Sequence, residues 1–175
     1  QNTEFLDLSV GSPLVSIENV KKSGHLMPNH IHAIVVPRSN DALSRFFATL
    51  HRRYARTTNA KYEWQGHLWQ ERFYSVVMRE PHALAAMRYI ELNPVRSGLV
   101  RFAHEWQWSS ARLHLGLANA PLVCAGATQG LVPDWRKYLD EALSDSDFDA
   151  IRRQTRTGRP EGPRKFIQAI ESISG

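Results

Sequence analysis

Two histidines and a tyrosine–asparagine pair are the residues whose types and spacing could support chemistry. His30 and His32 are separated by one residue in an apolar run, and a strand presents alternate side chains to the same side. Both imidazoles could therefore hold one divalent cation. Tyr89 and Asn93 are one helical turn apart, so both side chains could meet at a single site.

In combination, these four residues would suit the cleavage of a phosphodiester bond. A metal held by two imidazoles and an amide oxygen would polarise the phosphate, and a tyrosine hydroxyl would attack it. A phenol with a free pKa of about 10 needs a nearby positive charge to act as an oxyanion at neutral pH. Taken singly, the histidines also fit partly buried strand residues, Tyr89 a packing residue and Asn93 a helix terminator.

The first two elements that position these residues are visible in the hydrophobic pattern. The run His30–Val36 predicts a strand buried on both sides, which Pro37 closes. A helix packed on a core should follow, because apolar residues then recur at helical spacing. They are Leu43, Phe46, Phe47, Leu50 and Tyr54.

A second strand and a second helix complete the predicted core. The strand is expected over Phe73–Met78, and the helix is expected to begin at about Glu80. It should end near Asn93, because Pro94 lacks an amide hydrogen and disfavours helical geometry at the residue before it. Three further helices are expected in the tail, around Trp135–Ala142, Phe148–Arg153 and Phe166–Ile173.

Four segments in the middle of the chain resemble a known family, the single-tyrosine HUH transposases of the IS200 type. The resemblance is strongest to the branch associated with repetitive extragenic palindromes (REP) in bacteria. All four occur in the family order, which makes the match more specific than any one of them. They are MPNHIHAIV (Met27–Val35), GHLWQERF (Gly66–Phe73), MRYIELNPVRSGLV (Met87–Val100) and EWQWSSARLHLG (Glu105–Gly116). The tail segment Gln154–Glu171 is similar to the C-terminal extension of many members.

The resemblance implies a role for each candidate residue. His30 and His32 match the two metal-binding histidines, Tyr89 matches the nucleophile, and Asn93 stands where the family places a third, polar ligand. The implied cofactor is Mg²⁺ or Mn²⁺. The implied reaction is attack of Tyr89 on single-stranded or hairpin DNA from repetitive palindromic elements. It gives a 5′-phosphotyrosine link and a free 3′-hydroxyl, and the reverse attack rejoins the strand.

The same resemblance implies the fold and its division. The expected class is α+β, with a ferredoxin-like or RRM-like antiparallel sheet and helices on one face, plus a mostly helical C-terminal extension. Residues 1–25 would form an atypical N-terminal segment, residues 26–116 the catalytic domain and residues 117–175 the extension.

The charge distribution favours a nucleic-acid partner. Of the net charge of +5, residues 26–115 contribute 12 cations against 6 anions, in the stretch that holds the histidines and the tyrosine. Most of the cations in the chain are arginines, whose guanidinium groups can form two parallel hydrogen bonds to one phosphate. Candidate phosphate contacts are Arg52, Arg53, Arg56, Arg72 and Arg88, and Trp69 could stack a base. Solvated helix faces and a packing role for Trp69 are the competing interpretations.

The N-terminal segment departs from the family pattern. Relatives begin with a strand and a helix, whereas Gly11, Pro13 and the segment Lys21–Gly24 interrupt any such element here. The predicted loss of that strand would expose the edge of the histidine strand, through which a second copy could pair. Because the chain starts at Gln1 rather than Met, we expect it to be a fragment.

Composition excludes several other classes of protein. No apolar run reaches the roughly 18 residues of a membrane helix, and no secretory pattern opens the chain, so the expected location is cytoplasmic. Cys124 is the only cysteine, which excludes an internal disulfide and a cysteine-based zinc cluster.

Three functions therefore compete. The first is a transposase that nicks and joins DNA, and the second is a truncated relative that binds palindromic single-stranded DNA without cutting it. The third is a metal-dependent hydrolase of another substrate. It would need an acidic third ligand, and Asp41, Glu80 and Glu91 have no convincing spacing for that role.

Overall fold

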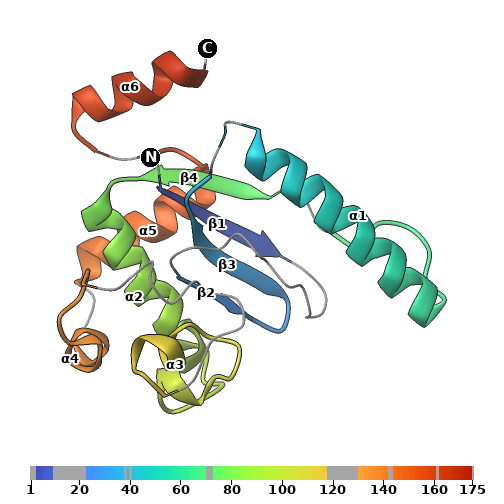
Figure 1. Cartoon of the computed structure of the whole chain (residues 1–175), viewed down its shortest axis with the longest axis horizontal. Coiled ribbons are helices and arrows are strands. Elements are labelled where there is room, and N and C mark those ends of the chain that lie inside the picture. Colours follow the sequence, from blue (N-terminus) through green and yellow to red (C-terminus); the bar gives the residue numbers. More distant parts are fainter. Residues whose placement is uncertain are drawn as a thin grey trace.

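The protein is built around a four-stranded antiparallel sheet with the strand order β2-β3-β1-β4 (Figure 1). This computed structural model describes residues 3–9, 23–37, 39, 41–69, 73–117, 130–141, 144–160 and 162–174. The strands are β1 (Thr3–Ser9), β2 (Ser23–Leu26), β3 (His30–Val35) and β4 (Tyr74–Met78). Both strands that the sequence pattern predicts are present, each shorter by one residue.

The hairpin of β2 and β3 carries the two predicted histidines. A tight turn joins the strands, and the N–H of Met27 donates to the carbonyl of His30 at 2.8 Å. The register pairs Leu26 with Ile31 and His25 with His32. Because directly opposed residues in a sheet point to the same face, this register places His25 on the face that holds His32.

Two long helices cover opposite faces of the sheet. Helix α1 (Ala42–Tyr62) inserts Phe47 among Ile31, Ala33 and Val35 of β3. Helix α2 (Glu80–Arg96) packs Met87 and Ile90 against Ile34, on the face of the histidines. The shorter helices are η1 (Ala103–Glu105), α3 (Ala111–His114), α4 (Trp135–Asp140), α5 (Asp145–Thr157) and α6 (Arg164–Ser174).

The predicted α+β class, the antiparallel sheet and the helical tail are confirmed, but the long helices do not share one face. The hydrophobic pattern of β3 explains this arrangement. Its residues are apolar on both sides, so each side needs its own cover. Figure 1 shows α1 and α2 on different sides of the sheet.

The predicted loss of the first strand is wrong. β1 lies between β3 and β4 and pairs with both, Asp7 opposite His32 on one side and opposite Tyr74 on the other. β2 also includes Ser23 and Gly24, where the sequence pattern predicts a break. β3 therefore has a neighbour on each side, and the proposed pairing of copies through its exposed edge loses its basis.

Helix α2 continues to Arg96 and does not end at Asn93 as predicted. Pro94 is buried within its last turn. A proline removes only its own N–H from the hydrogen-bond pattern, and the N–H of Ser97 still donates to the carbonyl of Asn93 at 2.9 Å. This extra turn carries Arg96 back toward Tyr89, seven residues earlier on the helix.

The outer edge of β2 is covered by the chain near residues 106–110. The N–H of Leu26 donates to the carbonyl of Trp108 at 3.1 Å, and the indole N–H of Trp106 donates to the carbonyl of Leu26 at 2.8 Å. A further bridge joins His25 to Ser109. These contacts show that the segment EWQWSS (Glu105–Ser110) has a structural role, because it holds β2 in place.

None of the helices in the described ranges combines the length and apolarity of a membrane span.

Phe47→Ala should lower the free energy of unfolding by about 3–5 kcal/mol, because it removes a fully buried ring from the core beneath α1. Denaturation in urea measures the loss. The control Phe102→Ala removes a ring that is 48% exposed and should cost less than about 0.5 kcal/mol. Equal losses in the two variants would contradict the position of Phe47 in the core.

Candidate functional site

Three histidines meet on the face of the sheet that α2 covers. His30 and His32 lie on β3 with ring centroids 4.7 Å apart, and His25 of β2 lies 5.1 Å from His32. One ligand atom from each of the three lies within 4.8 Å of the others. His30 and His32 are thus brought together as predicted, and His25 joins them as a third imidazole.

The three imidazoles are neutral at neutral pH. Burial, with smaller effects from His30 and Arg96, lowers the pKa of His25 to about 3. Burial also holds the pKa of His32 well below its usual range and lowers that of His30. Neutral imidazoles offer lone pairs to a cation.

The buried Nδ1 of His25 has no hydrogen-bond partner among the described residues. Buried nitrogen atoms in folded proteins almost always have a partner. A cluster of neutral imidazoles with such an atom fits a metal ion by its donor set.

Asn93 of α2 stands next to this cluster. Its Nδ2 lies 3.5 Å from Nε2 of His25 and 3.5 Å from Nε2 of His30. The oxygen and nitrogen of an asparagine amide exchange places by rotation of the side chain. Rotation would therefore bring an acceptor oxygen toward the histidines, as a fourth ligand requires.

Tyr89 lies one helical turn before Asn93, beside the same cluster. Its ring centroid is 6.3 Å from that of His32. The guanidinium of Arg96 lies 4.1 Å from the centre of the Tyr89 ring, and its Nη2 donates to the Tyr89 carbonyl at 2.9 Å. Phe148 of α5 packs against the tyrosine, with ring centroids 5.6 Å apart. The tyrosine therefore has a cation beside it.

Sequence reasoning misses His25 and Arg96. His25 lies in the stretch that shows no pattern of a strand, and only the pairing with β3 reveals its position. Arg96 lies beyond Pro94, where the helix was expected to have ended. The available signals were the histidine two residues before the MPNH turn and the arginine two turns after Tyr89.

A buried polar network fixes β2 against α2. Ser110 Oγ donates to Oε1 of the fully buried Glu91 at 2.6 Å. The N–H of Gly24 donates to that hydroxyl at 3.3 Å, and the N–H of Ser110 donates to the Gly24 carbonyl at 2.9 Å. His114 also bonds to Glu91 through Nδ1. The network holds the residue before His25, so it fixes the position of that imidazole.

The predicted DNA-contact residues of α1 lie away from this site. Arg52, Arg53 and Arg56 are exposed on α1, on the other side of the sheet from Tyr89. Trp69 packs against the same helix. Its ring stacks on His51 at 3.9 Å, and its Nε1 donates to the His51 carbonyl at 3.0 Å.

Of the two remaining predicted arginines, Arg88 points away from the histidine cluster. Arg88 is next to Tyr89 in sequence, but its guanidinium lies 3.6 Å from the centre of the Tyr138 ring and 3.3 Å from Glu141. Its side chain is only 12% exposed. Arg72 lies outside the described residues.

Comparison with known proteins finds similar sequences over the part of the chain that holds the cluster. Residues 17–93, which include His25, His30, His32, Tyr89 and Asn93, match the family described as IS200-like transposases. A Haemophilus influenzae protein described as a REP-associated tyrosine transposase is 30% identical, over 49% of this chain and 54% of its own length. The chain thus spans about half the length of this curated relative.

A solved structure shares the fold. It is that of a REP-associated tyrosine transposase bound to a REP hairpin, with a TM-score of 0.53 and 17% sequence identity. The likeness covers 69% of this chain and 84% of the other. The family match, the curated relative and the shared fold confirm the resemblance of this chain to the IS200-like transposases that its motifs predict.

Proposed function

We propose that this protein nicks and rejoins single-stranded DNA through a covalent bond to Tyr89. The observation that carries the proposal is the position of Tyr89. Its ring lies beside three clustered imidazoles and beneath a guanidinium, in the part of the chain that matches the IS200-like transposases. A tyrosine that only packs in the core would need none of these neighbours.

The residues that would hold a metal ion are His25, His30, His32 and, through its amide oxygen, Asn93. Three imidazole nitrogens favour a transition metal over Mg²⁺, which prefers oxygen ligands. Of the two ions predicted from the resemblance, we therefore propose Mn²⁺. When bound, the ion would draw electron density from the phosphate that is attacked.

The proposed step exchanges one phosphodiester for another. The Tyr89 oxygen bonds to phosphorus and loses its proton, while the bond from phosphorus to the 3′ oxygen breaks and that oxygen takes up a proton. The products are a 5′-phosphotyrosine and a free 3′-hydroxyl. Because a phosphodiester remains, the reverse attack can rejoin the strand without an external energy source.

Arg96 would assist this step in two ways. Its hydrogen bond to the Tyr89 carbonyl and its stacking on the ring restrain the tyrosine beside the histidines. Its positive charge stands next to the phenol, which needs such a charge to act as an oxyanion, and next to the place that the phosphate would occupy.

The proposed substrate is palindromic DNA that folds into a hairpin, like the REP hairpin bound in the structural neighbour. The exposed Arg52, Arg53 and Arg56 would bind phosphates outside the nicking site. DNA contact remains a prediction for Trp69, Arg72 and Arg88. A relative that binds DNA without cutting it remains the alternative to the nicking enzyme.

Tyr89→Phe should abolish the covalent adduct, because the attacking oxygen is lost while the ring and its packing remain. To measure the adduct, the protein is incubated with Mn²⁺ and a labelled hairpin oligonucleotide that carries a single-stranded flank. The adduct appears as a label that stays with the protein under denaturing electrophoresis. Tyr74→Phe, which alters an exposed tyrosine of β4, should form as much adduct as the parent.

The outcome also separates the competing functions. Adduct in the parent but not in Tyr89→Phe supports the transposase. Tight binding without any adduct in the parent supports the binding module. Adduct at the parent level in Tyr89→Phe would show that another residue is the nucleophile.

His25→Ala should weaken Mn²⁺ binding by at least about tenfold, because one of three clustered imidazoles is removed. Isothermal titration of the protein with MnCl₂ measures the affinity. The control His67→Ala removes an exposed histidine outside the cluster and should leave the affinity unchanged. Unchanged affinity in His25→Ala would remove His25 from the ligand set.

Arg96→Ala should slow adduct formation by at least about tenfold and at the same time tighten Mn²⁺ binding. The positive charge of Arg96 helps to lower the pKa values of His25 and His32. The same charge should repel a cation bound to these imidazoles. Single-turnover adduct kinetics and titration with MnCl₂ give the two values. Arg101→Ala, which removes an equal charge outside the cluster, should change neither.

The opposite signs distinguish a role in the site from a role in folding. If both activity and Mn²⁺ affinity fall in Arg96→Ala, the residue only supports the structure. Adduct formation in Arg96→Lys should fall between the parent and the alanine variant, because the charge remains but the planar guanidinium that stacks on the Tyr89 ring is lost.

A further inference from the structure

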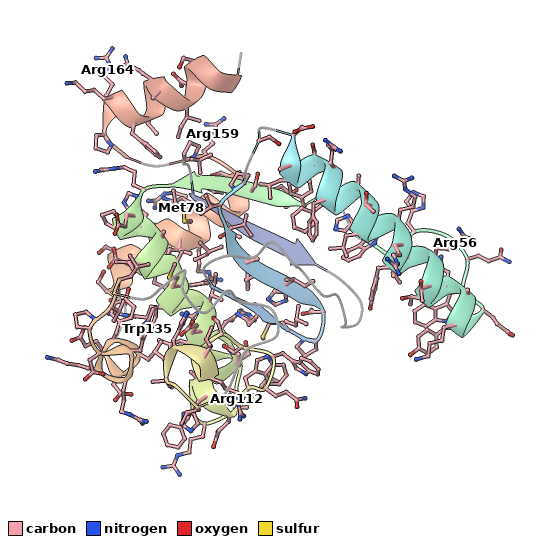
Figure 2. The ribbon with its side chains drawn as sticks, viewed as in Figure 1. Arg56, Met78, Arg112, Trp135, Arg159 and Arg164 are labelled. Atoms are coloured by element: carbon pink, nitrogen blue, oxygen red, sulfur yellow. The ribbon has the colours of Figure 1, made fainter. Side chains whose placement is uncertain are left out.

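Helix α1 presents an unbalanced positive surface. It carries five cations and no acidic residue between Ala42 and Tyr62. Arg52, Arg53 and Arg56 are exposed, and Arg56 follows the other two by four and three positions, a spacing at which like charges destabilise a helix. Among the described residues, no acidic side chain forms an ion pair with these three. Figure 2 shows Arg56 directed away from the sheet.

An exposed aromatic pair ends the same helix. Tyr62 and Trp64 are 49% and 55% exposed, and their rings stack with centroids 5.1 Å apart and planes 28° from parallel. The ammonium of Lys61 lies 4.9 Å from the centre of the Tyr62 ring. Aromatic side chains on a positively charged surface are typical of sites that bind single-stranded nucleic acid.

The position of Trp64 is fixed by the end of the helix. Glu63 adopts a left-handed conformation with φ 56°, and the N–H of Trp64 then donates to the Asn59 carbonyl at 2.9 Å. Asn59 Nδ2 in turn donates to the carbonyl of Gly66 at 3.1 Å. These bonds hold the loop against the helix, so the stacked rings are in place before any ligand binds.

The aromatic pair is separate from the site of Tyr89. α1 packs through Phe47 on one face of the sheet, and α2 carries Tyr89 on the other. A helix of 21 residues is about 31 Å long, which carries Trp64 well away from the start of α1. In Figure 1, α1 extends away from the other helices. Trp64 therefore follows a helix that packs on the opposite face of the sheet from Tyr89.

We propose that the end of α1 is a second binding site for single-stranded DNA, in which Tyr62 and Trp64 stack bases and Arg52, Arg53 and Arg56 bind phosphates. The proposal rests on the proposed function, because the strand bound here would flank the one that Tyr89 cuts. A single strand fits better than a duplex, since paired bases do not expose their faces for stacking.

Charge argues against a second copy of the chain as the occupant. Pairing two copies through this end of α1 would bring Arg52, Arg53, Arg56 and Lys61 of each copy together, with no acidic residue in α1 to offset them. A polyanion removes the same repulsion by binding.

The test measures the binding of a labelled 20-nucleotide single strand of mixed sequence by fluorescence anisotropy over a range of salt concentrations. Trp64→Ala should weaken binding at least about fivefold, and Trp64→Phe should recover most of the loss. Replacing Arg52, Arg53 and Arg56 together by Gln should reduce the slope of log K against log salt by about 2.

The control is Phe102→Ala, which disrupts another stacked pair, formed by the exposed Phe102 and the half-buried His104, on another part of the protein. Its affinity and salt slope should equal those of the parent. The variants alter exposed side chains, and thermal unfolding should show parent-like stability. Parent-like affinity in both Trp64→Ala and the triple variant would overturn the proposal. A change from dimer to monomer in Trp64→Ala, without any change in affinity, would also overturn it and assign the pair to an interface between copies.

Failure of this proposal can be told apart from failure of the proposed nicking reaction. A short oligonucleotide at saturating concentration should form as much adduct with Trp64→Ala as with the parent. Loss of DNA affinity in Trp64→Ala supports the second site even if the parent forms no Tyr89 adduct. A Tyr89 adduct together with parent-like binding by Trp64→Ala supports the nicking reaction and excludes the second site.

Discussion

The register between β2 and β3 is the constraint on which the site depends. Opposing His25 to His32 brings the third imidazole onto the face of the other two. A slip of one residue would turn the side chain of His25 to the face that α1 covers and replace it with an apolar neighbour. Two features of the fold prevent that slip. The turn at Met27 limits the loop, and the buried bond between Glu91 and Ser110 fixes the strand from its outer side.

Helix α2 positions the remaining side chains of the site relative to the histidines. Its inner face anchors on Ile34 of the histidine strand, so Asn93 and Tyr89 are placed relative to the same strand as the imidazoles. Pro94 lies in the last turn without ending the helix, and the same turn returns Arg96 to the tyrosine. Tyr89, which we propose as the nucleophile, Arg96 and the candidate ligands thus belong to one hairpin and one helix, which suits a site whose geometry must be accurate.

Periodicity in the sequence predicts those parts of the site that lie within one element. Alternation on a strand relates His30 to His32, and one helical turn relates Tyr89 to Asn93. It cannot predict His25 or the first strand, because both take their positions from partners distant in sequence. Proximity in sequence is also misleading for Arg88. One residue corresponds to about 100° around a helix, which turns Arg88 toward Glu141 and away from the cluster.

The central place of β1 in the sheet has a consequence for how the chain folds. β1 precedes the other described strands in the sequence, yet its partners are β3 and β4, whose residues extend to Met78. During synthesis on the ribosome, β1 can pair with β3 once that strand has been made, but its other edge stays unpaired until β4 has been made. Such long-range pairing slows folding and leaves an open edge available for aggregation. The β2–β3 hairpin, whose strands adjoin in sequence, can form earlier and provide the template on which β1 adds.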